Sequence, residues 1–77
     1  MKAKEYDRIR TLVEVREGFW RHRVFPAGTR GTIIECYSDP EEGYAVDLAV
    51  PDETSVTGFD YGNVILKPDQ FEVVEIA

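Results

Sequence analysis

The stretch that decides the fold is Phe25-Pro26-Ala27-Gly28-Thr29-Arg30-Gly31-Thr32-Ile33-Ile34-Glu35-Cys36-Tyr37. It places Pro26 and two glycines, Gly28 and Gly31, directly before a run of β-branched and aromatic residues. Proline fixes φ, and glycine adopts the positive φ values that a tight turn before a strand needs. The run 32–37 favours a half-buried strand. We therefore predict that Gly28 and Gly31 form a structural turn at the corner of a small, strongly bent all-β barrel.

Turn-forming residues divide the rest of the chain into further short β-like segments. Residues 44–48 alternate apolar side chains with small or acidic ones, which is the period of a strand with one buried face. Glycine and proline recur too often for helices beyond about 12 residues, the marginal length for stability, and only residues 2–10 leave room for a helical turn. We predict five principal strands, with one short 3-10 turn over 67–70 before the last. The predicted strands cover residues 6–15, 32–37, 44–48, 56–66 (interrupted at 60–63) and 71–76.

The apolar positions of these segments predict the core. The expected core residues are Ile9, Val13, Ile33, Val46, Leu48, Val64, Leu66, Phe71 and Val73.

The length of 77 residues fits a single domain over 1–77, with residues 1–5 expected to be frayed. One cysteine excludes an internal disulfide, and one cysteine with one histidine cannot supply a four-ligand Cys/His zinc site. The first residues have no apolar segment, and no apolar run approaches the roughly 20 residues that span a bilayer. We therefore expect a cytoplasmic protein with no membrane contact and no cofactor.

The net charge of -6 is unevenly distributed along the chain. Residues 1–31 carry eight of the nine basic side chains and four acids, whereas residues 32–77 carry one base and eleven acids. One interpretation is a bipolar surface that steers a partner. The other is that basic early strands pair with acidic later strands through ordinary cross-strand ion pairs.

Four segments together resemble a known family: residues 6–9, residues 27–35, residues 44–48 and residues 66–72. They resemble small bacterial SH3-like barrel proteins that are grouped as a domain of unknown function. The Gly-X-X-Gly-Thr-Ile turn is also similar to the SH3-like barrels of nitrile hydratase β subunits and of KOW-type translation modules. The resemblance covers about residues 6–74 and implies an SH3-like barrel. Residues 16–24 and 55–63 are longer than this pattern requires.

Only residues 17–25 combine cations with aromatic side chains. Tryptophan and arginine are enriched in the hot spots of protein interfaces, and aromatic and basic side chains also stack on bases and neutralise phosphates. We predict a partner-binding surface formed by Trp20, Arg21, Arg23 and Arg30. The alternative is architectural, with Phe19, Val24 and Phe25 closing one end of the barrel and Trp20 lying over it.

No other residue points to catalysis or metal binding. His22 lies between two arginines, which would disfavour its charged form, and it has no nucleophile beside it in sequence. Cys36 lies within a strand next to an acid, so a core role is expected. The acidic residues lack the spacing of an EF-hand or of a catalytic carboxylate pair. We predict no catalytic, metal or cofactor site.

The sequence therefore favours a small acidic, non-enzymatic protein-interaction module, either an accessory subunit or an antidote that masks a basic surface. The expected partner is another protein, and the expected state is a monomer or weak homodimer. The alternative function is nucleic-acid binding by a KOW-like module. That function needs a contiguous basic footprint, which only residues 16–30 could supply.

Overall fold

The computed structural model describes residues 1–17 and 23–77, and within them the chain is all-β. The strands are β1 (Arg8–Thr11), β2 (Val15–Glu17), β3 (Arg23–Phe25), β4 (Arg30–Tyr37), β5 (Gly43–Pro51), β6 (Phe59–Leu66) and β7 (Phe71–Glu75). The predicted helical turn is present as the 3-10 helix η1 (Pro68–Gln70) directly before the last strand.

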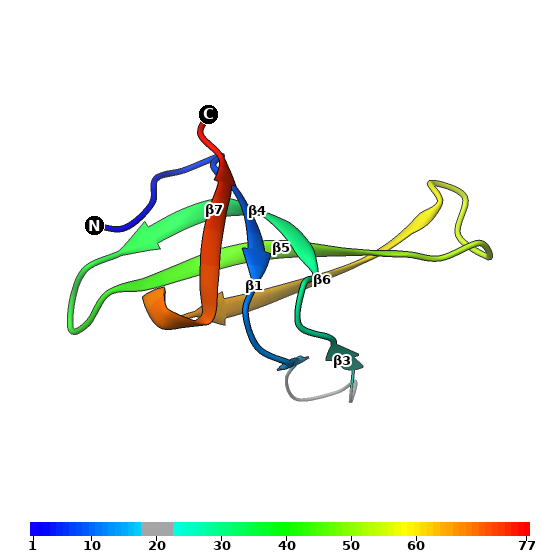
Figure 1. Ribbon diagram of the computed structural model, residues 1–77, viewed down its shortest axis with the longest axis horizontal. Coiled ribbons are helices and arrows are strands. Elements are labelled where there is room, and N and C mark those ends of the chain that lie inside the picture. The colour runs from blue at the N-terminus through cyan, green and yellow to red at the C-terminus, as the bar shows by residue number, and fades with distance from the viewer. Residues whose placement is uncertain (18–22) are drawn as a thin grey trace.

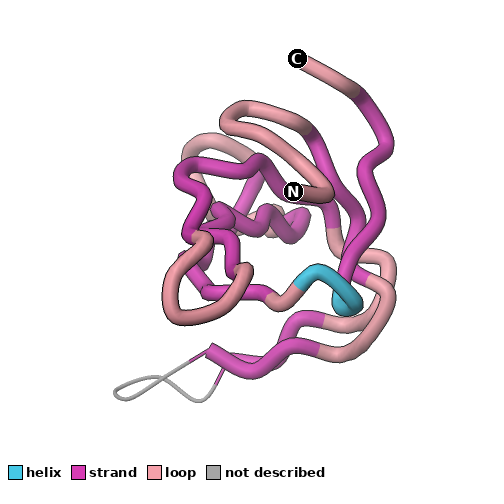
Figure 2. Tube along the Cα trace, turned by 90° about the vertical axis from the view of Figure 1, so that its left-hand side faces the viewer, coloured by secondary structure: helices cyan, strands magenta, loops and turns pink. Residues whose placement is uncertain are grey.

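Five of the strands form one antiparallel sheet in the order β6-β5-β4-β1-β7, and β2 pairs with β3 in a second sheet. The β5–β6 hairpin extends well beyond the rest of the molecule (Figure 1). Seen along the long axis, the large sheet curls around the interior, with the β2–β3 pair on one side (Figure 2). A register shift in β4 between Ile33 and Glu35 adds a residue opposite β5, and such bulges increase local bend and twist.

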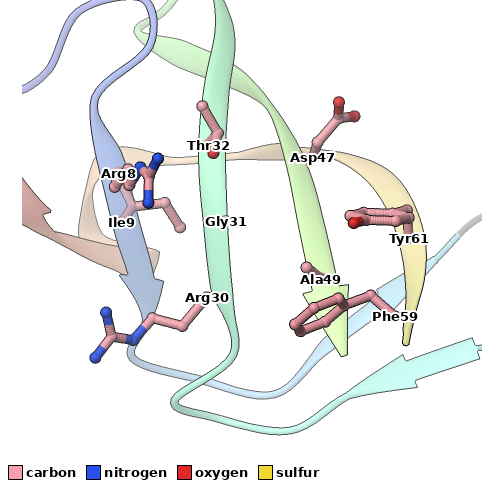
Figure 3. A pocket seen from close by; sticks show the side chains of 9 residues that line it. All are labelled: Arg8, Ile9, Arg30, Gly31, Thr32, Asp47, Ala49, Phe59 and Tyr61. Atoms are coloured by element: carbon pink, nitrogen blue, oxygen red, sulfur yellow. The ribbon is translucent and has the colours of Figure 1, made fainter. Parts of the chain in front are cut away.

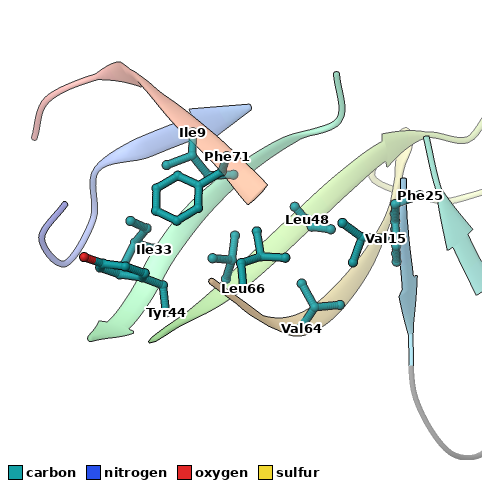
Figure 4. Close-up of a cluster of buried hydrophobic side chains, with 10 residues drawn as sticks. Ile9, Val15, Phe25, Ile33, Tyr44, Leu48, Val64, Leu66 and Phe71 are labelled. Atoms are coloured by element: carbon teal, nitrogen blue, oxygen red, sulfur yellow. The ribbon is translucent and has the colours of Figure 1, made fainter. Parts of the chain in front are cut away.

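The core lies on the concave face of the large sheet, where strand alternation places the apolar side chains. In β5, Tyr44, Val46 and Leu48 are fully buried. Tyr44 packs edge-on against Phe71, with 5.1 Å between the ring centroids. Val15 and Phe25 of the small sheet close the other end of the same cluster (Figure 4). The two sheets therefore share one core.

Most of the predicted core residues are buried, and two are not. Val13 is 41% exposed, and Val73 is partly buried and packs against the cluster. Val13 lies in the bend between β1 and β2, where the chain leaves the large sheet and side-chain alternation no longer applies. Four buried apolar residues were absent from the predicted core, namely Val15, Phe25, Tyr44 and Ala45.

The prediction of a five-stranded closed barrel is wrong in strand number and in closure. The single strand predicted over 6–15 is two strands, because residues 12–14 bend the chain so that Val15 pairs with Phe25 in the second sheet. In the described ranges, β6 and β7 are the outer strands of the large sheet and do not pair with each other. In the described part of the chain the two sheets therefore do not close into a barrel.

The prediction for residues 56–66 is also corrected. Val56 lies in the loop before β6 and is fully exposed, and β6 runs without interruption through residues 60–63. These polar and glycine residues resemble a break in sequence, but Asp60, Gly62 and Asn63 each pair with a residue of β5.

Candidate functional site

The four residues predicted to bind a partner do not form one described surface. Trp20 and Arg21 lie outside the described residues, as do Phe19 and His22. Arg23 and Arg30 are described, and they lie in different settings.

Arg23 is committed to contacts within the molecule. Its Nε donates to Glu17 at 3.0 Å, one terminal nitrogen pairs with Asp60, and the other donates to the carbonyl of Tyr61 at 2.6 Å. Its side chain is only 22% exposed. Hydrogen bonding to the two carboxylates, first to Asp60, raises the pKa of Arg23 despite the opposing effect of burial. These contacts join the β2–β3 hairpin to β6.

Arg30 lies on the convex, outward face of the large sheet. The strand registers place Arg10, Arg30, Ala49 and Tyr61 in one row across β1, β4, β5 and β6. Side chains opposite one another in a sheet share a face, so this row lies on the face away from the core. Adjacent strands lie about 4.8 Å apart, which separates the Arg30 and Tyr61 backbones by roughly 10 Å.

A solvent-open groove of about 430 Å³ crosses this face, and we call it the outer groove. One wall is formed by Arg8 and Arg30, the other by Phe59 and Tyr61, and the small side chains of Thr32 and Ala49 lie between them (Figure 3). The groove is hollow because the side chains of Thr32 and Ala49 at its floor are small, whereas the arginines and aromatic residues on either side are large.

The aromatic wall is a pair of neighbouring rings. Phe59 and Tyr61 alternate on the outward face of β6, with 6.2 Å between their centroids and 41° between their planes. They are 42% and 54% exposed. Aromatic side chains supply large contact areas at interfaces. Sequence reasoning missed both residues because it treated residues 60–63 as a break, although Phe59, Tyr61, Asn63 and Ile65 show the period-two exposure of one strand face.

The arginines near the groove differ in their charge partners. Arg8 pairs with Glu75 at 3.3 Å, and Arg10 pairs with Glu72. Asp47, at the far end of the groove, accepts a hydrogen bond from the Asn63 amide at 2.7 Å. Arg30 is exposed and has no carboxylate within 4.0 Å in the part of the chain that the structure describes. The unmatched positive charge of the groove is therefore at Arg30.

The two glycines predicted for the turn have different roles. Gly28 has a φ of 91° in the turn before β4, and its N–H donates to the Thr11 carbonyl at 2.7 Å. Gly31 is not a turn residue, because it lies within β4 without a positive φ. A Cβ at Gly31 would lie 2.8 Å from both the Asp47 carbonyl oxygen and Cδ2 of Leu48. Close packing against β5 therefore requires glycine at position 31.

Cys36 is half-buried, packs against the core cluster, and its Sγ lies 3.8 Å from the Ala3 carbonyl oxygen. Burial raises the pKa of its thiol, and the nearby carboxylates of Glu5, Asp7 and Glu35 raise it further. A thiolate nucleophile needs the opposite surroundings. These surroundings agree with the core role expected for this residue.

Over residues 1–17 and 23–77, no group of three His, Cys, Asp or Glu side chains is arranged to hold a metal ion. No helix in the described part of the chain has the length and apolarity needed to cross a membrane. Comparison with known protein families, with curated proteins and with solved structures gives no match for this chain.

Proposed function

We propose that this chain is a non-enzymatic protein-interaction module and that the outer groove is its partner-binding site. The observation that supports the proposal is the juxtaposition of Arg30, which has no carboxylate partner among the described residues, with the exposed Phe59–Tyr61 pair across a hollow in the sheet. Arginine and aromatic side chains dominate the binding energy of protein interfaces because they combine large area with hydrogen-bond donors.

The location differs from the surface that the sequence predicts. Arg30 is common to both, whereas Arg23 holds the two sheets together and is not part of the groove. In the groove, Phe59 and Tyr61 supply the aromatic surface that the sequence-based prediction expected from Trp20. The role of Trp20 and Arg21 stays a separate prediction.

The charge around the groove favours a protein over a nucleic acid. Arg8 in the groove and Arg10 beside it already have carboxylate partners, and Asp47 adds a negative charge at one end of the groove. A nucleic-acid strand carries a phosphate at every nucleotide and needs a continuous basic path. An exposed aromatic pair beside one unmatched cation fits a peptide with few charges better.

The proposal is tested by panning a random library of displayed peptides of about ten residues, which span roughly 30 Å when extended. The folded protein is the bait, and a matched bait carries Tyr61→Ser. We expect the folded protein to enrich a related set of sequences, and we expect the variant to lose that set. Failure to enrich any set, or the same set from both baits, contradicts the proposal.

A further inference from the structure

We infer that the outer groove selects an extended acidic-apolar peptide segment, in which a carboxylate binds Arg30 and an apolar side chain covers Phe59 and Tyr61. The inference rests on the proposed function and deepens it, because it specifies the chemistry of the partner. It follows from the charge, the apolar surface and the spacing of the groove.

The carboxylate is assigned from the charge pattern. Glu75 neutralises Arg8 at 3.3 Å, so Arg30 is the cation of the groove that lacks a partner among the described residues. A guanidinium offers donors in a planar fork that matches one carboxylate in a bidentate pair. Asp47 at the other end of the groove repels a second anion. The segment therefore carries one acidic side chain at this site rather than a run of them.

The apolar contact is assigned from the second wall. Phe59 and Tyr61 leave 42% and 54% of their surfaces exposed, and the methyl group of Ala49 lies beside them at the floor. Covering such surface removes apolar area from water, which favours binding. A leucine, methionine or aromatic side chain of the partner gives the largest gain at this position.

The spacing sets the pattern of the segment. The outer groove runs across the strands, and the Arg30 and Tyr61 backbones lie roughly 10 Å apart. In an extended peptide, alternate side chains face the same side, and positions i and i+2 lie about 7 Å apart. Figure 3 shows the Arg30 side chain extending away from Phe59 and Tyr61, and turning this long side chain toward the groove brings the two contacts to the shorter spacing. The acidic and apolar residues therefore lie two positions apart, with the one intervening side chain directed away from the sheet.

The test uses two synthetic peptides of about ten residues in a Gly/Ser background. One contains Glu and Phe two positions apart, and the other contains Gln in place of Glu. Each is titrated into the isotope-labelled protein, and amide chemical shifts are recorded. We expect the Glu peptide to shift the amides of Arg30, Gly31, Ala49 and Tyr61. The Gln peptide should bind about tenfold more weakly, because it lacks the charge-assisted pair.

Matched variants identify the contacts. Arg30→Gln should weaken the Glu peptide about tenfold and abolish the difference between the two peptides. Arg16→Gln removes an exposed arginine outside the groove and should change nothing. Tyr61→Ser should weaken both peptides, whereas Ile65→Ser, on the same face of β6 but outside the groove, should not.

Three outcomes overturn the inference. Equal binding of the Glu and Gln peptides, or no binding of either, removes the carboxylate assignment. Chemical-shift changes confined to another surface would show that the peptides do not bind in the outer groove. Binding of a thymidine oligonucleotide at the same amides, with an affinity that falls steeply with salt, assigns the groove to nucleic acid. If library peptides without this pattern still depend on Tyr61, the proposed function stands and only the inferred chemistry fails.

Discussion

At the scale of single residues, Gly31 sets how closely β4 and β5 approach. A side chain at this position would meet the Asp47 carbonyl and the Leu48 and Val46 side chains, all within 2.9 Å. These neighbours belong to a central strand and to the core, so they have little freedom to move.

We expect Gly31→Ala to lower the free energy of unfolding by about 1–3 kcal/mol, the usual cost of overpacking a core. Urea denaturation measures the change. Gly43→Ala is the matched control, because a Cβ there meets its nearest neighbour at an ordinary 3.7 Å. Equal effects of the two substitutions would show that close packing is not the reason for Gly31.

Asp7 ties the two ends of the described chain together. Its carboxylate accepts the Ala77 N–H at 2.9 Å, the Lys4 N–H at 3.1 Å and the Lys4 ammonium at 3.0 Å. The Ala77 N–H contributes most to lowering the pKa of Asp7, the Lys4 groups add to it, and burial acts in the opposite direction.

A lowered folded-state pKa means that Asp7 stabilises the protein above its unfolded pKa, near 3.9. This stabilisation is lost as the pH falls through the lower folded value. We expect Asp7→Asn to flatten the loss of stability below about pH 4, measured as urea midpoints from pH 2 to 6. Asp69→Asn, at an exposed position of η1, is the control, and this variant should lose stability below about pH 4 as the unmodified protein does. An unchanged pH profile for Asp7→Asn would contradict this role.

At the scale of elements, side chains of the small sheet satisfy the outer edge of β6. Glu17 accepts the Asn63 N–H at 2.9 Å, and Arg23 donates to the Tyr61 carbonyl at 2.6 Å. Both groups lie on β6, which has no hydrogen-bonded neighbour strand on that side among the described residues. An uncovered strand edge is a template for unwanted pairing. The β2–β3 hairpin therefore protects this part of the edge without extending the sheet.

We expect Arg23→Gln to lower the free energy of unfolding by about 1–3 kcal/mol, since hydrogen bonds to charged groups are lost in a partly buried setting. A double-mutant cycle with Asp60→Asn should show coupling between the two residues. Arg16→Gln is the control, because its pair with Glu14 is exposed and such pairs contribute little. Unchanged stability for Arg23→Gln would return this residue to the partner-binding role that the sequence predicts.

The elements also show what the sequence could predict. The alternation of residues 44–48 located the first half of β5 and the buried residues Val46 and Leu48, although the predicted core left out Tyr44. Residues 60–63 were misread because their local preference favours a turn, whereas pairing with β5 and the Glu17 and Arg23 contacts hold them in a strand. Gly62 fits there because any Cβ would lie 2.3 Å from the Phe25 ring. Such a contact depends on the tertiary structure and leaves no local signal.

The candidate site was less predictable than the fold. Arg30 is one of the residues that the sequence predicts to bind a partner. Its partners across the groove, Phe59 and Tyr61, lie on a strand two positions away in the sheet. Which side chains meet across a sheet depends on the register of each pair, and β4 contains a bulge that shifts this register. A sequence alone does not give that register.

At the scale of the whole molecule, part of the uneven charge along the sequence is explained by strand pairing. Basic β1 lies beside acidic β7, and the pairs Arg8–Glu75 and Arg10–Glu72 join them. The expectation of cross-strand ion pairs is confirmed. These pairs are largely exposed and contribute little individually. With Arg8 and Arg10 paired, Arg30 on the neighbouring strand β4 is the arginine of the outward face that has no carboxylate partner among the described residues.

The pairing of the first strand with the last has a consequence for the time course of folding. The β4–β5–β6 meander closes through short loops, whereas β1 meets β7 only when most of the chain is in place. Distant pairings carry a larger loop-closure cost and slow the search. We expect the meander to be formed in the transition state and the β1–β7 contact to form late. In stopped-flow refolding, Val46→Ala should then mainly slow folding, whereas Phe71→Leu should mainly accelerate unfolding. If Phe71→Leu instead mainly slows folding and Val46→Ala mainly accelerates unfolding, the contact between β1 and β7 is the part formed in the transition state.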